Sequence, residues 1–210
     1  MNGIVSASIE EYMEKLIPQR DKTLMEMEEV AEREEIPIVG PQVGTLLNIL
    51  AHLAGANKIL ELGTAIGYST TWLARGLSSE AGRVVTIEGN STSAQRAKGY
   101  LSQAGVAERV SVMVGNALEI VPTLKDKFDL IFVDINKEDY PTVLPQCVDL
   151  LRDGGLLVTD NVLWGGMVAS DDTSSSTQAI REYNRLLSQD SRMLTTIVPL
   201  RDGVSISIKG

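Results

Sequence analysis

The 210-residue chain carries 43% hydrophobic and 22% charged residues, a balance that suits a globular protein with one large core. No apolar run approaches the ~20 residues of a membrane span, and the first residues lack the pattern of a signal peptide, so we expect a cytoplasmic protein that contacts no membrane. The formal charge of −9 disfavours broad contact with nucleic acid phosphates, although an acidic protein can still carry a local basic patch.

The chain has a single cysteine and a single histidine. Cys147 lies in an apolar segment and is expected to be a buried, unreactive thiol. One thiol and one imidazole cannot form a disulfide, a thiolate cluster or a multi-histidine metal site. Any catalysis must therefore use other side chains.

The first part of the chain, residues 1–40, is predicted to be a helical preface of two helices, and residues 36–41 should then form an extended crossing. Ser8 and Glu11 form a capping box that should open the first helix, and Pro18 should end it. An amphipathic helix over about residues 21–34 should follow, with apolar residues at helical spacing. The role expected for both helices is packing.

Strands and helices then alternate, which predicts a core over residues 41–210 and one domain over residues 1–210. The predicted strands are 58–62, 83–88, 109–115, 127–134, 154–161, 193–200 and 203–210. An apolar helix from residue 43 should end at Gly55, and further helices should lie between the strands. The pattern predicts an α/β fold with a doubly wound, Rossmann-like, mostly parallel sheet and an antiparallel hairpin at its C-terminal edge.

A glycine loop follows the first predicted strand. Glu61 is near the end of that strand, and Gly63, Thr64 and Gly67 lie in the loop before the next helix. The spacing E-x-G-x-x-x-G differs from the dinucleotide fingerprint G-x-G-x-x-G, whose second glycine admits a pyrophosphate. It suits S-adenosylmethionine (SAM) better, because Glu61 and loop backbone could bind its ammonium end. We therefore predict that these four residues contact SAM.

An acidic residue, Glu88, closes the second predicted strand and could accept both ribose hydroxyl protons. Ribose recognition also suits NAD, so a nucleotide-binding oxidoreductase or a non-catalytic Rossmann module stays an alternative. A strand, turn and helix without any ligand is a further alternative, because many folds reuse this geometry.

Oxygen-bearing side chains close two later strands. Asp134 ends one, and Asp160 and Asn161 end the next, so all three should face the same crevice. Two carboxylates and one amide are hard ligands that suit a Mg²⁺-like ion and leave positions for water and substrate. Lys137 follows Asp134 by one helical turn and could act as a base. The alternatives are helix caps, turn formers and a solvated lysine.

Five motifs, LELGTAIGYST, TIE, GNAL, FVDINKEDY and TDNVLWGG, resemble those of the cation-dependent class I O-methyltransferases of catechols and caffeoyl-CoA. The resemblance covers residues 38–210. It implies a seven-stranded sheet, SAM as methyl donor, a divalent cation and a homodimer. Mg²⁺ is the expected cation, with Mn²⁺ or Ca²⁺ as alternatives.

The resemblance also assigns residues to roles. Lys137 matches the proposed general base, with Asp134 beside it, and Asp134, Asp160 and Asn161 match the metal ligands. Those that match the SAM site are Val39, Glu61, Gly63, Ser69, Glu88, Ala117 and Asp134.

Two departures limit what the resemblance implies. Asn136 stands where relatives carry an aspartate or an aromatic wall, so no relative's substrate can be transferred, although Asn136 is still predicted to contact the acceptor. Asn116 replaces an acid that is common near the adenine. Trp164 could form a wall of the acceptor pocket or could only pack against other protein side chains.

We expect a phenolic, catechol-like acceptor with two adjacent hydroxyls. Methylation of a hydroxylated tRNA uridine is the alternative and calls for a basic rim.

Overall fold

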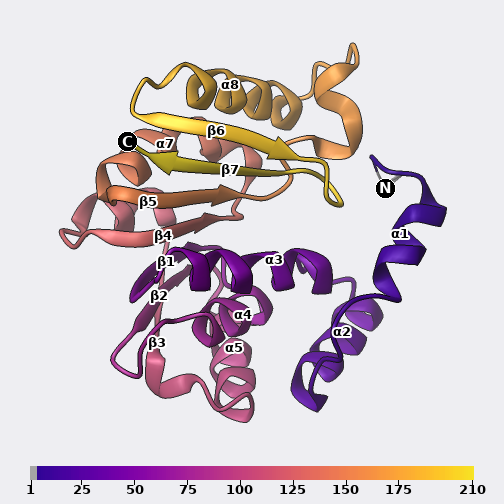
Figure 1. The fold of residues 1–210 in the computed structure, drawn as a ribbon, viewed down its shortest axis with the longest axis vertical. Coiled ribbons are helices and arrows are strands. Elements are labelled where there is room, and N and C mark those ends of the chain that lie inside the picture. The colour runs from indigo at the N-terminus through magenta and orange to yellow at the C-terminus, as the bar shows by residue number, and fades with distance from the viewer. Residues whose placement is uncertain (1–3) are drawn as a thin grey trace.

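The computed structural model describes residues 4–210, so residues 1–3 of the predicted preface lie outside the described chain. Within residues 4–210, seven strands form one sheet in the order β3-β2-β1-β4-β5-β7-β6 (Figure 1). The strands are β1 (Lys58–Leu62), β2 (Arg83–Glu88), β3 (Val110–Val114), β4 (Phe128–Val133), β5 (Leu151–Thr159), β6 (Met193–Val198) and β7 (Val204–Lys209). β7 pairs antiparallel with β5 and β6, and the other pairs are parallel. The predicted fold class, including the edge hairpin, is confirmed.

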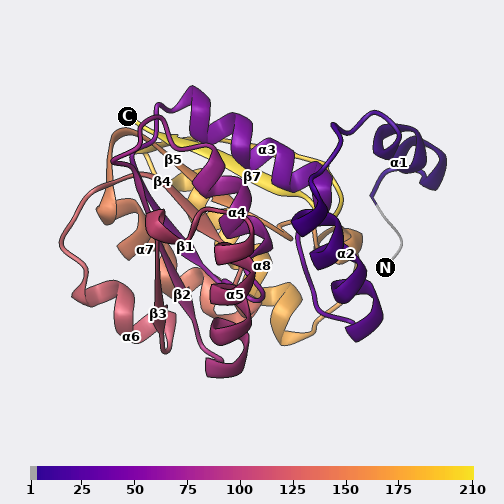
Figure 2. The same ribbon diagram turned by 90° about the horizontal axis from the view of Figure 1, so that it is seen from below.

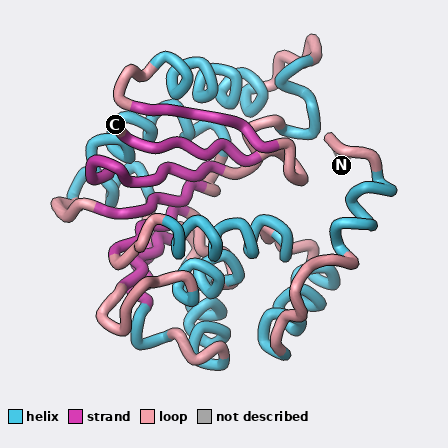
Figure 3. Tube along the Cα trace, viewed as in Figure 1, coloured by secondary structure: helices cyan, strands magenta, loops and turns pink. Residues whose placement is uncertain are grey.

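Helices surround the sheet, as Figure 3 shows. The α-helices are α1 (Ala7–Glu14), α2 (Lys22–Glu34), α3 (Gly40–Leu53), α4 (Tyr68–Arg75), α5 (Ser91–Gln103), α6 (Ala117–Ile120), α7 (Tyr140–Leu150) and α8 (Ser175–Gln189). Short 3-10 helices are η1 (Ala107–Arg109), η2 (Val121–Thr123), η3 (Lys137–Asp139) and η4 (Trp164–Ala169). In the part of the chain described, no helix combines the length and the apolar character needed to cross a bilayer.

Two apolar clusters lie on opposite faces of the sheet. Ile59 of β1 belongs to the cluster shared with α3, α4 and α5, whereas Leu60 and Leu62 belong to the cluster shared with α7 and α8. Side chains alternate along a strand, so a central parallel strand needs apolar residues on both faces. Glu61 follows the same alternation, which places it on the face of Ile59.

The single cysteine belongs to the second cluster. Cys147 is fully buried in α7, and burial raises the pKa of its thiol to about 12. A thiol with this pKa stays protonated and unreactive at neutral pH. The expectation of a buried, inert thiol is confirmed.

The preface differs from the prediction at its first helix. Ser8 lies inside α1 and Ser6 is the N-cap residue, without a side-chain cap, so the predicted capping box is wrong. The helix ends at Glu14, before Pro18, and none of its residues is buried. Figure 2 shows α1 beyond α2, away from the sheet. The second helix agrees with the prediction, and Asp21 caps it by accepting a hydrogen bond of 3.0 Å from the Leu24 amide.

The boundaries of two core elements also differ. The helix predicted from residue 43 begins at Gly40, three residues earlier than expected. β5 begins at Leu151 instead of residue 154, because its register shifts between Phe128 and Leu130 of β4 and accommodates Gly154. β5 also ends at Thr159, which leaves the next two residues in the crevice beyond the strand.

Candidate active site

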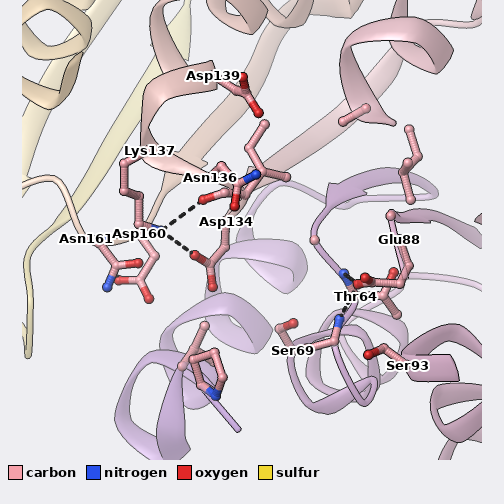
Figure 4. Close-up of a pocket in the computed structure, with 18 of the residues that line it drawn as sticks. Thr64, Ser69, Glu88, Ser93, Asp134, Asn136, Lys137, Asp139, Asp160 and Asn161 are labelled. Atoms are coloured by element: carbon pink, nitrogen blue, oxygen red, sulfur yellow. Dashed lines mark hydrogen bonds and ion pairs between the residues drawn. The ribbon is translucent and has the colours of Figure 1, made fainter. Parts of the chain in front are cut away.

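A cavity of about 870 Å³ opens at the carboxyl ends of the parallel strands. This is the edge at which open α/β sheets bind ligands. Figure 4 shows two groups of polar residues in it, one around Glu88, Thr64 and Ser69 and another around Lys137 and Asp134. The predicted SAM residues that line the cavity are Val39, Gly63, Thr64, Ser69, Glu88 and Ala117, with Asp134 between the groups.

Gly63 brings the ends of β1 and β4 together. It adopts a left-handed conformation with φ +96°, and a Cβ at this position would lie 1.9 Å from the Asp134 carbonyl oxygen. The Asp134 amide also donates a hydrogen bond of 2.8 Å to the Leu62 carbonyl. Glycine is therefore required here both for its conformation and for the close approach of the two strands.

Glu88 fixes the loop that follows β1. Its Oε2 accepts hydrogen bonds from the amides of Thr64, at 3.2 Å, and Ala65, at 2.7 Å, while Oε1 accepts one of 2.9 Å from Asn90. The half-buried carboxylate lines the cavity and is held from three directions. It is therefore a preorganised acceptor at the end of β2.

Glu61 and Gly67 are not among the residues that line the cavity, and their contact with SAM stays a prediction. Glu61 is fully buried and accepts a hydrogen bond from the Thr70 hydroxyl of α4, and burial raises its pKa to about 7. Gly67, with φ +88°, is the N-cap residue of α4 and packs near Ala97 and Leu101. Strand alternation directs Glu61 under α4 instead of into the crevice.

The second group centres on the amine of Lys137. Its Nζ donates hydrogen bonds to Asp134 Oδ1 at 2.9 Å, to the Ile135 carbonyl at 3.1 Å and to the Tyr140 hydroxyl at 2.9 Å. The side chain is only 12% exposed, and Nζ lies 5.0 Å from the centre of the Tyr140 ring and 5.9 Å from that of Trp164. The amine is therefore held in one place at the cavity wall.

Asp160 is a buried carboxylate beside this amine. The residue is only 4% exposed, and its Oδ1 accepts a hydrogen bond of 2.9 Å from the backbone amide of Asn161. Burial, and then the charge of Asp134, raise the pKa of Asp160 to about 7. The ionised carboxylate is therefore unfavourable here unless additional positive charge lies nearby.

The donor set fits a hard divalent cation. Asp134, Asp160 and Asn161 all line the cavity, and the Asn161 amide nitrogen lies 3.5 Å from Asp202 Oδ2. Within residues 4–210, no group of three or more His, Cys, Asp and Glu side chains is arranged to hold a metal. A site here would therefore use two carboxylates and one amide oxygen, which is a chemistry that Mg²⁺ accepts. The repulsion at Asp160 is an observation that favours a cation.

The cavity also contains residues that the sequence did not single out. The predicted acceptor contacts, Asn136 and Trp164, both line it, but so do Glu138, Asp139 and Tyr68. Glu138 accepts hydrogen bonds from two serines at the start of α8. Its place beside Lys137 in the KEDY segment was a usable signal. No comparable signal marks Ser93 or residues 36–38, which also line the cavity.

Comparison with known proteins gives the family. A family model described as O-methyltransferase matches residues 6–210. This chain belongs to the O-methyltransferase family. The resemblance noted from the five motifs is thereby confirmed, and the match covers nearly the whole O-methyltransferase chain.

Relatives agree with this placement. A catechol O-methyltransferase of Niastella koreensis is 32% identical over 99% of each chain. A catechol O-methyltransferase of Mycobacterium tuberculosis is 34% identical and covers 90% of this O-methyltransferase and 87% of its own length. Matches of this extent leave no large domain unaccounted for in either relative.

Solved structures share the fold. The O-methyltransferase TomG of Streptomyces achromogenes, in complex with SAM, has a TM-score of 0.88 and 36% identity over 96% of each chain. An O-methyltransferase of Bacillus cereus, in complex with SAH, has a TM-score of 0.88 and 32% identity over 97% of each chain. This O-methyltransferase therefore shares its whole architecture with them.

Proposed function

We propose that this enzyme transfers the methyl group of SAM to one hydroxyl of a small catechol-like acceptor, with help from a divalent cation. The observation that supports this most is the single cavity with two unlike ends. Glu88 and the glycine loop lie at one end, and Lys137, Asp160 and Asn161 lie at the other. SAM as donor is further supported by the SAM and SAH complexes of related O-methyltransferases.

The chain's own residues supply binding, orientation and a proton acceptor. Glu88 would hold the ribose of SAM, and Lys137 would take the proton from the acceptor hydroxyl. As the acceptor oxygen bonds to the methyl carbon, the bond from that carbon to the sulfonium sulfur breaks and S-adenosylhomocysteine (SAH) leaves. Asp134, Asp160 and Asn161 would hold the cation, with Mg²⁺ expected first. The cation would act as a Lewis acid that favours the ionised form of an acceptor hydroxyl. Aligning the two reactants can supply roughly 7–11 kcal/mol in favourable cases.

The charge of the cavity favours a small acceptor over a polyanion. Among the described residues that line it, one lysine faces five carboxylates: Glu88, Asp134, Glu138, Asp139 and Asp160. Lys137 is already paired with Asp134. Phosphate-rich acceptors, such as a coenzyme A thioester or tRNA, would meet repulsion here. Membership of the O-methyltransferase family also removes support from the oxidoreductase alternative.

A matched pair of acceptors tests this function. Caffeic acid should be methylated with a kcat/KM at least about 100-fold higher than the same compound lacking one of its two hydroxyls, because two oxygens fix the attacking one in line with the methyl group. The measurement is the initial rate with labelled SAM. Similar kcat/KM values would contradict the vicinal-hydroxyl model, and the tRNA-uridine alternative would then be tested with unmodified and hydroxylated tRNA.

Removing the charge of Glu88 should weaken SAM binding. Glu88→Gln keeps an oxygen for the loop amides but loses charge-assisted bonds to the ribose, each worth roughly 1.5–3 kcal/mol, so calorimetry should show a Kd raised at least about tenfold. Glu80→Gln is the matched control, because Glu80 is exposed and precedes the amino end of β2. Parental affinity in Glu88→Gln would mean that the ribose lies elsewhere.

The homodimer stays a prediction of the family resemblance. Apolar side chains that are exposed in the single chain are consistent with it, among them Ile9, Tyr12 and Leu16 of the first helix and the segment after it. Ile9 and Tyr12 are three residues apart within α1, so they lie on one side of this helix.

A further inference from the structure

The turn that joins β6 to β7, residues 199–203, contacts two segments that line the cavity. On one side, Arg201 Nη1 donates a hydrogen bond of 3.1 Å to the Ile38 carbonyl. Ile38 belongs to the segment 36–39, which lines the cavity and includes the predicted SAM contact Val39. We call this segment the donor wall. Arg201 does not line the cavity itself, so it contacts the wall and no ligand.

The Arg201 guanidinium fills the space beside Gly40, the residue that follows the donor wall. A Cβ at Gly40 would lie 2.3 Å from Arg201 Nη1 and 3.1 Å from its Cζ. Both residues have left-handed backbones, with φ +71° at Gly40 and +49° at Arg201. This conformation costs glycine little but is unfavourable for arginine. A residue with a strained backbone at such a contact favours a functional role.

On its other side, the same turn holds residues 161–165, which we call the acceptor wall. The Asp202 carbonyl accepts a hydrogen bond of 2.9 Å from the Leu163 amide. The Asp202 carboxylate accepts a hydrogen bond from the backbone amide of Gly165. Its Oδ2 also lies 3.5 Å from the side-chain nitrogen Nδ2 of Asn161. Asn161 and Trp164 of this wall line the cavity, whereas Asp202 does not.

We propose that Arg201 and Asp202 are positioning residues that set the spacing between the donor wall and the acceptor wall. The inference rests on the proposed methyl transfer, whose rate depends on how the two reactants are aligned. Arg201 affects the affinity for SAM because it is hydrogen-bonded to the donor wall. Asp202 acts on the acceptor side because three of its oxygens face the acceptor wall.

The first experiment measures the Kd of SAM by calorimetry on the full chain, without acceptor. Arg201→Ala should raise this Kd about tenfold, because SAM binding would then have to order a donor wall that Arg201 no longer holds in place. Arg201→Lys keeps a donor without the planar guanidinium and should recover part of the affinity. The control is Arg185→Ala, which removes an exposed arginine of α8 that pairs with Glu182 and should leave the Kd unchanged.

Gly40→Ala provides a second, independent variant. The added methyl should displace the guanidinium and raise the Kd of SAM as well. Its effect in an Arg201→Ala background should be smaller than its effect alone, because the clash is gone and only the backbone cost remains. Strictly additive effects would contradict a shared contact.

Asp202→Asn should show the opposite pattern to Arg201→Ala. Its Kd for SAM should stay parental, while kcat falls and the KM of the acceptor rises, because the acceptor wall shifts and the donor wall does not. If the parent binds SAM and Arg201→Ala binds it equally tightly, the positioning role is wrong. If the parent itself does not bind SAM, the proposed function fails instead, so the two failures are distinguishable.

Discussion

Lys137→Arg should lower kcat by at least about 100-fold while the Kd of SAM stays near the parental value, because a general base typically contributes 10²–10⁴ to the rate. Arginine keeps the positive charge that pairs with Asp134 but is effectively never neutral, so it cannot accept a proton. Lys137→Met, which removes the amine, should lose turnover to a similar extent. The measurements are steady-state rates at saturating acceptor and calorimetry with SAM.

Lys58→Arg is the matched control for this prediction. Lys58 is exposed at the start of β1 and pairs with Asp126. Turnover should therefore stay parental in Lys58→Arg. Near-parental turnover in Lys137→Arg would reduce Lys137 to an electrostatic contact with Asp134, since the arginine could still make that contact.

Asp160→Asn should abolish most turnover and yet stabilise the ligand-free protein at alkaline pH. The loss of turnover, at least about 100-fold, should match the loss on exhaustive EDTA treatment of the parent, which added Mg²⁺ should reverse. The gain in stability follows from removing a buried charge that faces Asp134. Thermal unfolding without ligand measures the second effect.

The pH dependence of this stability has a definite sign. The pKa of Asp160 is about 7 in the folded protein, whereas the ordinary value for an aspartate is 3.8. Between these two pH values the folded chain therefore binds more protons than the unfolded chain. The parent's free energy of unfolding therefore falls as pH rises from about 4 to about 7. The advantage of Asp160→Asn should be largest at about pH 8 and vanish near about pH 4. Glu61, whose pKa is also about 7, adds a slope of the same sign in both proteins.

Asp153→Asn is the control, because Asp153 is exposed in β5 and should leave turnover and the pH slope unchanged. An Asp160→Asn variant that survives EDTA with full turnover would remove the cation from the proposal. A variant that is less stable than the parent at about pH 8 would instead show that the Asp160 carboxylate is needed structurally.

Much of the fold was readable from the sequence because its strands are strongly apolar. β4 is buried almost throughout, and its pattern specified a central strand with Asp134 just beyond it. The same logic located Asp160 beyond β5 and Glu88 at the end of β2. The carboxyl ends of parallel strands meet at one edge, and these three residues do line one cavity.

The errors arose where a local pattern was read without its neighbours. The motif of Glu61 does not show that strand alternation puts its side chain on the face of Ile59 under α4, and its contact with SAM stays a prediction. Ser8 has the spacing of a cap relative to Glu11, but the N-cap residue is Ser6, two residues earlier. The contact between Arg201 and Ile38 joins residues that are far apart in the chain, and no local pattern could indicate it.

The buried thiol of Cys147 has a practical consequence. Because this cysteine is fully buried and stays protonated at neutral pH, maleimide reagents should not react with it in the native enzyme. A cysteine introduced at an exposed position, such as Thr173→Cys before α8, would then carry a fluorophore or spin label alone. The natural chain is thus ready for site-specific spectroscopy of the polar segment 170–174 before α8, and its own cysteine need not be removed first.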